Sequence, residues 1–371
     1  MIKNNKKPGI GYFVADHAII IALIVFWGIL ILTNPAFSNF QIFATIIKQA
    51  SIFAVVGIGM TFAVISGAFD LSVASQIALS SVVLTSIVTR ITPSNPLLGL
   101  IISCLIIIVL GLVMGLINGT LIARLRIPAF ITTLAMQLVY RGIAQLVNDS
   151  PVPWGTLGSG YQIFTTGVGV PQTIRIGNFE VLHLMGFSFS RIFGLPLFFY
   201  IMIILAVIGT IILRKTGLGR NILAIGNSRE AARVAGISIS KTQTITYVMV
   251  GLFTAFAALM MTSHQGMSNF GVPTGTEFTV ISAVVLGGTA LAGGKGSILN
   301  TVIASLFIAT IPTALTMFGV NPDSHDIFNG IILVIAFSIN TIRLYADDAI
   351  VKFRARRKAA VGAVGEQTSK S

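Results

Sequence analysis

Long apolar runs alternate with short polar segments along the chain, and several of these runs contain no charged residue. No Asp, Glu, Lys or Arg occurs between Asp16 and Lys48, or between Arg90 and Arg124. A helix of about 20 predominantly apolar residues crosses the hydrocarbon core of a bilayer. The pattern therefore predicts an all-α, polytopic membrane protein. We expect about ten transmembrane helices, near residues 18–34, 46–67, 71–89, 97–122, 127–147, 195–213, 243–264, 279–294, 298–318 and 327–344.

The composition excludes an ordinary soluble domain. Hydrophobic residues make up 54% of the chain and charged residues only 9%, whereas about 25% of the residues of a soluble domain are charged. The net charge of +13 can indicate nucleic-acid binding, but Lys and Arg also gather in the cytoplasmic segments of membrane proteins. We therefore expect the lipid bilayer, and no nucleic acid, as a partner.

The positions of the basic residues predict the topology. If both ends of the chain are cytoplasmic, 19 of the 24 Lys and Arg residues fall in inner segments, as the positive-inside rule requires. The prediction is an N-in/C-in transmembrane domain over residues 1–350, followed by a basic cytoplasmic tail at 351–371. Two long loops interrupt this domain, an outer loop at 148–194 and a basic inner loop at 214–242. Within the outer loop, the alternation in TIRIGNFEVL predicts a small hairpin.

Catalytic and metal-binding residue types are scattered. The single cysteine, Cys104, lies in an apolar run, and the four histidines have no ligand spacing. No Ser/His/Asp set or carboxylate pair has the spacing of a catalytic site. We expect no metal site, no cofactor bound by this chain and no enzymatic activity.

Two glycine-interrupted apolar stretches, residues 57–80 and 280–305, occupy corresponding places in the two halves. The second contains GGTALAGGKGS, which is no phosphate-binding loop, because Lys295 falls one position late and glycine follows it where Ser or Thr is required. Paired interruptions predict a transporter with two pseudo-symmetric halves, although glycines also permit close helix packing. The expected helix-break glycines are Gly67, Gly287, Gly288, Gly293 and Gly294.

Two acidic residues lie close to predicted spans. Asp70, in GAFDLS, is a functional candidate as an acid within the membrane; the alternative is a cap for a helix that starts at Leu71. Glu277, in PTGTEF, is expected as an acid at the N-terminal end of the eighth span.

Four motifs resemble those of ABC importer permeases of the ribose/xylose/arabinose-type sugar family. The inner loop contains Glu230-Ala231-Ala232 followed by Gly236, similar to the E-A-A-x-x-x-G loop of ABC importer permeases. GMTFAVISGAFDLSVAS, LIARLRIPAFITTLAM and AVVLGGTALAGGKGS match, in order, three further stretches of the sugar permeases, and the likeness covers roughly residues 45–340. Ala68 and Ala74 stand where the family has glycines, which leaves the substrate open.

This resemblance implies the partners and the mechanism. Glu230, Ala231, Ala232 and Gly236 would form a short coupling helix that docks on an ATPase subunit with two nucleotide-binding domains, with Gly236 closing the helix in a left-handed cap. ATP and Mg²⁺ would be used by that subunit alone. An extracytoplasmic binding protein would deliver a monosaccharide to the chain and to a second permease copy or sister permease, in a bacterial-type inner membrane.

Sugar transport requires hydrogen-bonding side chains along the pathway. The candidates are Thr61, Ser66, Asp70, Ser72, Asn118, Gln137 and Thr289. Ser and Thr hydroxyls also bond to their own helix backbone, which is the alternative for these positions. Two other functions remain open: a secondary transporter of a small polar solute, which also uses broken helices, and a membrane scaffold or receptor. Neither needs a helix that docks on an ATPase.

Overall fold

The computed structural model describes residues 18–91, 96–148, 150, 152–153, 175–176, 179–180, 191–192, 195–265, 267–268, 275–321, 324, 327–328, 330–335 and 338. The predicted tail at 351–371 lies outside these residues. Most of the predicted outer loop and parts of the predicted tenth span also lie outside them.

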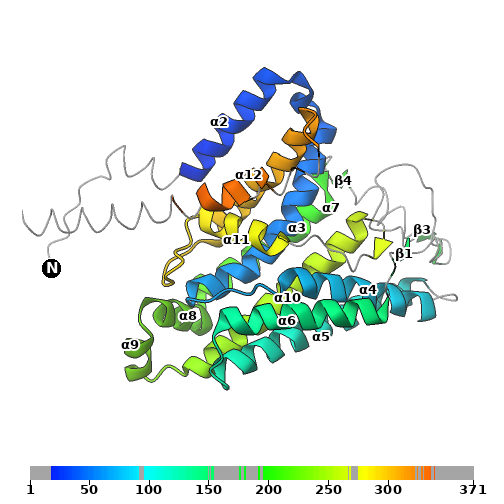
Figure 1. The fold of residues 1–371 in the computed structure, drawn as a ribbon. Helices are drawn as coiled ribbons and strands as arrows, with labels where there is room; N and C mark the ends of the chain where they lie inside the picture. Colours follow the sequence, from blue (N-terminus) through cyan, green and yellow to red (C-terminus); the bar gives the residue numbers. More distant parts are fainter. Residues whose placement is uncertain are drawn as a thin grey trace, which may run out of the picture.

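The described chain is almost entirely helical (Figure 1). Its helices are α2 (Ala18–Thr33), the 3-10 helix η1 (Pro35–Ser38), α3 (Phe40–Ile65), α4 (Val73–Ile91), α5 (Pro96–Ala123), α6 (Ala129–Val147), α7 (Leu197–Lys215), α8 (Gly217–Asn227), α9 (Arg229–Val234), α10 (Ile239–Gln265), α11 (Thr276–Leu286) and α12 (Ile298–Met317). Helices α4, α5, α6 and α10 lie side by side, α3 packs between this group and α12, and α8 and α9 project at one end.

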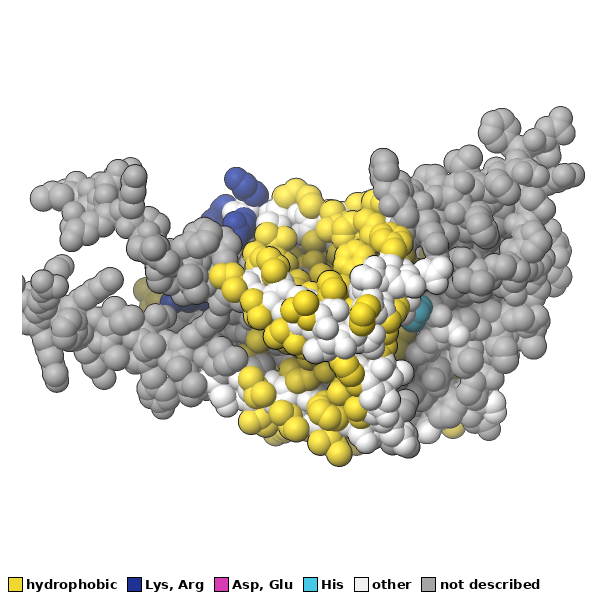
Figure 2. Space-filling view, turned by 90° about the horizontal axis from the view of Figure 1, so that it is seen from above, with side chains coloured by type: hydrophobic (Ala, Val, Ile, Leu, Met, Phe, Trp, Pro, Cys, Tyr) yellow, Lys and Arg dark blue, Asp and Glu magenta, His cyan; other side chains and the backbone are white. Residues whose placement is uncertain are grey.

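The helices confirm a polytopic all-α membrane protein. Six of them, α3, α5, α6, α7, α10 and α12, are long and apolar enough to cross a bilayer, and α2, α4 and α11 are shorter apolar helices. Apolar side chains cover much of the molecular face in Figure 2, while Lys and Arg side chains lie toward the end where Figure 1 places α8 and α9. The span predicted at 279–294 is wrong at its C-terminal end, because α11 stops at Leu286 and a glycine-rich loop follows.

Polar side chains set several of the helix starts. Asn39, Thr216, Ser228 and Ser297 each accept a hydrogen bond from a backbone N–H of the first turn, at the starts of α3, α8, α9 and α12 respectively. Such caps satisfy N–H groups that have no partner within the helix.

Glycines bring α5 and α10 into backbone contact. A Cβ on Gly115 would fall well under 3.0 Å from the backbone of Tyr247, and one on Gly111 would similarly collide with Gly251. Small residues permit this approach where lipid supplies little hydrophobic drive between helices. These glycines therefore allow α5 and α10 to pack closely, and none of them interrupts its helix.

Short antiparallel strands lie in the segments between the helices. β2 (Arg175–Ile176) pairs with β3 (Phe179–Glu180), which confirms the predicted hairpin. β4 (Arg191–Ile192) pairs with β5 (Leu195–Pro196). β1 (Val152–Pro153) pairs with β6 (Met267–Ser268), and this pairing joins the segment after α6 to the segment after α10.

Candidate functional site

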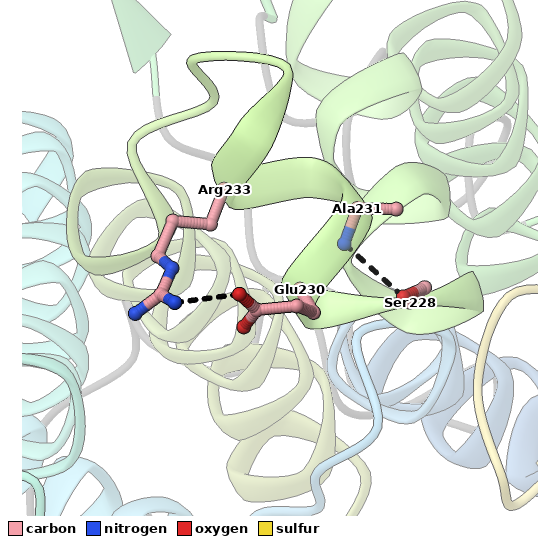
Figure 3. A network of polar contacts seen from close by, with 4 residues as sticks. All are labelled: Ser228, Glu230, Ala231 and Arg233. Carbon is pink, nitrogen blue, oxygen red and sulfur yellow. Dashed lines mark hydrogen bonds and ion pairs between the residues drawn. The ribbon is translucent and has the colours of Figure 1, made fainter.

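The inner loop folds into the two short helices α8 and α9. Ser228 ends α8 and begins α9, where its hydroxyl accepts a hydrogen bond from Ala231 N (3.2 Å; Figure 3). Glu230 and Arg233 form an ion pair across one turn, at 2.5 Å, with both side chains largely exposed. An exposed pair of this kind contributes little stability to the fold.

Helix α9 ends at a glycine in the left-handed conformation. Gly236 has φ +78°, and its N–H donates to Arg233 O (3.0 Å) while Ile237 N donates to Ala232 O (3.0 Å). This is the cap geometry expected for the E-A-A-x-x-x-G motif. Ala232 is buried, whereas Val234 is 81% exposed. The helix thus presents an exposed apolar side chain beside the exposed charges of Glu230 and Arg233.

The glycine-rich loop between α11 and α12 uses its backbone N–H groups within the protein. Gly288, Gly293 and Gly294 have positive φ values. Gly293 N donates to Ala290 O (2.9 Å), and Gly294 N donates to Ile65 O (2.8 Å), at the end of α3. A phosphate-binding loop directs its N–H groups at the anion. These N–H groups are instead committed to carbonyl oxygens of the chain.

The two glycine-interrupted stretches lie against each other. Thr61 Oγ1 on α3 lies 2.9 Å from Thr301 Oγ1 on α12, and either hydroxyl can donate to the other. Each hydroxyl also lies within hydrogen-bond distance of its own chain's backbone, at Gly57 O for Thr61 and at Ser297 O for Thr301. Ser66 likewise donates to Ala63 O (2.7 Å). Thr61 and Ser66 therefore have the backbone bonds of the alternative interpretation, and Thr61 in addition links the two halves.

A buried polar cluster surrounds Asp70. Its carboxylate, with no exposed surface, accepts hydrogen bonds from Ser72 N (2.9 Å), Ser72 Oγ (2.5 Å), Gln76 Nε2 (3.1 Å) and Asn118 Nδ2 (3.1 Å). Tyr140 OH, on α6, reaches Asn118 Oδ1 at 3.0 Å. The Asp70 cluster, defined as these five residues, joins the segment between α3 and α4 to α5 and α6.

The cluster brings together three of the predicted pathway residues, Asp70, Ser72 and Asn118. The sequence reasoning missed Gln76 and Tyr140; the available signal for Gln76 was its position one helical turn after Ser72. The helix after Asp70 begins at Val73, two residues later than predicted. Asp70 nevertheless accepts a backbone N–H immediately before that helix. It thus combines a capping bond with a direct link to α5 through Asn118, which in turn contacts Tyr140 on α6.

Gln137 and Thr289 lie apart from the Asp70 cluster. Gln137 Nε2 on α6 donates to Glu277 Oε1 (3.0 Å), and Glu277 Oε2 accepts from Gly275 N (3.3 Å). Glu277 lies in the first turn of α11, as expected, and its side chain is buried. The Thr289 hydroxyl is buried and has no hydrogen-bond partner in the part of the chain that the structure describes. Within that part, no three His, Cys, Asp or Glu side chains gather as metal ligands would.

Known proteins resemble the chain over nearly its whole length. The family model described as "Branched-chain amino acid transport system / permease component" matches residues 42–337. The ribose import permease protein RbsC of Haemophilus influenzae is 29% identical over 91% of this chain and 96% of its own length. The corresponding protein of Escherichia coli K12 is 32% identical over 86% and 92%. The galactose/methyl galactoside import permease protein MglC of Escherichia coli K12 is 27% identical over 91% and 97%. No solved structure matches. The chain therefore belongs to this permease family, as a multi-pass permease of the sugar ABC importer type that its curated relatives represent.

Proposed function

We propose that the chain is the membrane-spanning subunit of an ATP-driven importer of a monosaccharide similar to ribose or galactose. Two relatives that match it over 91% or more of both chains are import permeases for ribose or galactose. The observation that carries the ATP-driven part is α9, a short capped helix with an exposed apolar residue in a basic loop. An ATPase subunit with two nucleotide-binding domains docks there and uses ATP and Mg²⁺; this chain hydrolyses none.

The other partners follow from the same proposal. An extracytoplasmic binding protein delivers the sugar, and a second permease copy or sister permease completes the pathway in a bacterial inner membrane. The chain crosses this membrane ten times with both ends inside. Gln137 and Glu277 are our candidates for direct sugar contact, because an amide and a carboxylate offer both donors and acceptors to hydroxyl groups. ATP and substrate drive transport by binding the inward- and outward-facing states unequally.

Gly236→Val tests the docking role of α9. A β-branched residue is strained by about 1–3 kcal/mol at a positive φ, so the cap of α9 should be lost, and uptake of labelled ribose or galactose should fall while membrane insertion is unchanged. Ala235→Val is the matched control, since Ala235 is an adjacent exposed residue with φ −74°. Normal uptake by Gly236→Val would show that α9 is not the coupling element.

A further inference from the structure

We infer that Gly226 is a positioning residue for transport, through which movement of the docking helices α8 and α9 reaches the buried end of α3. This inference rests on the proposed function, in which α9 meets the ATPase. Gly226 lies in the last turn of α8, two residues before the cap of α9. Its backbone contacts two segments from opposite halves of the chain, the end of α3 and the loop between α11 and α12.

Three backbones meet at this point with no side chain between them. A Cβ on Gly226 would lie far inside 3.0 Å from both Ile65 O and Gly294 N, the two atoms that already share a hydrogen bond of 2.8 Å. A Cβ on Gly293 would in turn fall 3.0 Å from Gly226 O. Asn227 completes the junction, because its Oδ1 lies 2.5 Å from where a Cβ on Gly294 would be. We call these five residues the glycine junction.

The junction leads directly to the Asp70 cluster. Ile65 is the last residue of α3, and the segment that follows it carries Asp70, whose carboxylate is tied to α5 and, through Asn118 and Tyr140, to α6. A side-chain layer can absorb a small displacement by changing rotamer, whereas backbones in direct contact cannot. A shift of α8 on ATPase docking therefore moves the end of α3 and the glycine loop together. Packed elements with two discrete arrangements convert such small shifts into a change of state.

The test is Gly226→Ala, with Gly217→Ala as its matched control in the same helix. A Cβ on Gly217 meets nothing nearer than Arg220 Nη2 at 3.9 Å, so both variants add one methyl group to α8 but only Gly226→Ala forces the junction apart. Each variant replaces the wild-type chain in its own host. Three quantities are measured: ATPase subunit co-purified with the chain, ATP hydrolysis by the purified complex, and uptake of labelled ribose and galactose.

We expect Gly226→Ala to keep the ATPase subunit and its hydrolysis but to lower sugar uptake roughly 2- to 30-fold, the range expected for changes along a coupling path. Gly217→Ala should match the wild type in all three measurements. Normal uptake by Gly226→Ala would overturn the inference and leave the proposed function standing. A wild-type chain that brings no ATPase, or that carries neither sugar, would overturn both.

Asn227→Ala keeps the inference testable if Gly226→Ala does not reach the membrane. This change adds no volume and removes an exposed side chain that lies against Gly294. The fold should therefore persist. We expect uptake per ATP hydrolysed to fall about two- to threefold because the junction loosens. An unchanged ratio in Asn227→Ala would overturn the inference.

Discussion

The two glycine-containing breaks end their helices in the same way and then diverge. After α3, Gly67 N donates to Val64 O and Ala68 N to Ala63 O; after α11, Gly288 N donates to Val285 O and Thr289 N to Val284 O. Gly67 and Gly288 have φ +81° and +85°. The first break then leads to the buried Asp70, whereas the second forms the tight glycine loop on Ile65. The same cap geometry is thus followed by a buried polar link in the first half and by a backbone contact with α8 in the second.

Their acids also occupy different places. In the first half, Asp70 follows the break and is held by four hydrogen bonds from neutral donors. In the second half, Glu277 lies at the opposite end of the broken helix α11 and pairs across to Gln137. Ionisable residues inside a membrane domain are costly and tend to be functional. The difference predicts that Asp70 matters mainly for structure and coupling, and Glu277 mainly for the transported sugar.

Asp70→Ala should have the largest effect. Removing the carboxylate takes away the acceptor of the Ser72 N–H and hydroxyl, and leaves Gln76 Nε2 and Asn118 Nδ2 with Ser72 Oγ alone. A buried donor without an acceptor costs about 1–3 kcal/mol. We expect a strongly lowered thermal unfolding midpoint in detergent and no measurable uptake. Leu291→Ala, at the corresponding distance after the second break, removes a partly buried apolar side chain and should cost only about 1–2 kcal/mol. Equal losses from the two variants would contradict the contrast between the breaks.

Glu277→Gln should have an intermediate effect, seen only in the KM for sugar uptake. The neutral amide keeps the shape but weakens hydrogen bonds to sugar hydroxyls by about 1 kcal/mol, so the KM for uptake should rise roughly fivefold. Unfolding and ATP hydrolysis should change little. Thr279→Val, in the same turn region of α11, is the control, because the Thr279 hydroxyl bonds to Gly275 O of its own helix. A changed maximal rate with an unchanged KM would argue against sugar contact by Glu277.

Gly67→Ala and Gly288→Ala should have the smallest effects, and the two should be similar. Each places a Cβ at a positive φ, which costs about 1 kcal/mol. At Gly67 no steric clash adds to this backbone strain, because the nearest atom to an added Cβ is Ala292 O at 3.9 Å. The measurement is the thermal unfolding midpoint of each variant in detergent, and the two midpoints should be similar. Midpoints that differ widely would show that the two caps are not energetically equivalent.

The sequence predicted which segments are helical better than where the helices stop. The apolar runs placed α2, α4 and α7 within two residues of their observed ends. The end of α11 was missed because glycine alone does not terminate a helix: Gly57 and Gly59 lie within α3, where they allow neighbouring side chains and backbone to approach. The apolar pattern carries no sign of tertiary contacts such as that of Gly294 N with Ile65 O, which hold the glycine-rich loop against the end of α3.

The candidate site was predictable where chemistry is local. The E-A-A-x-x-x-G spacing predicted the C-terminal cap of α9. Gly236 lies two residues after Val234, the last helical residue, and adopts the left-handed conformation of such a cap. The Asp70 cluster was predictable only in part. Gln76 lies one helical turn after Ser72 and bonds to it locally, whereas Tyr140 joins the cluster only through the packing of α6 against α4 and α5. Gly226 carried no signal at all, because its partners are backbone atoms 161 residues earlier, at Ile65, and 68 residues later, at Gly294.

The most direct test of the central claim is to purify the tagged chain from its own membrane in mild detergent and identify its companions by mass spectrometry. An ATP-driven sugar importer predicts an ATPase with two nucleotide-binding domains in stoichiometric amount, together with sugar uptake that stops when cellular ATP is depleted. A chain that repeatedly purifies alone, with uptake that persists without ATP while the proton gradient is intact, would contradict the account.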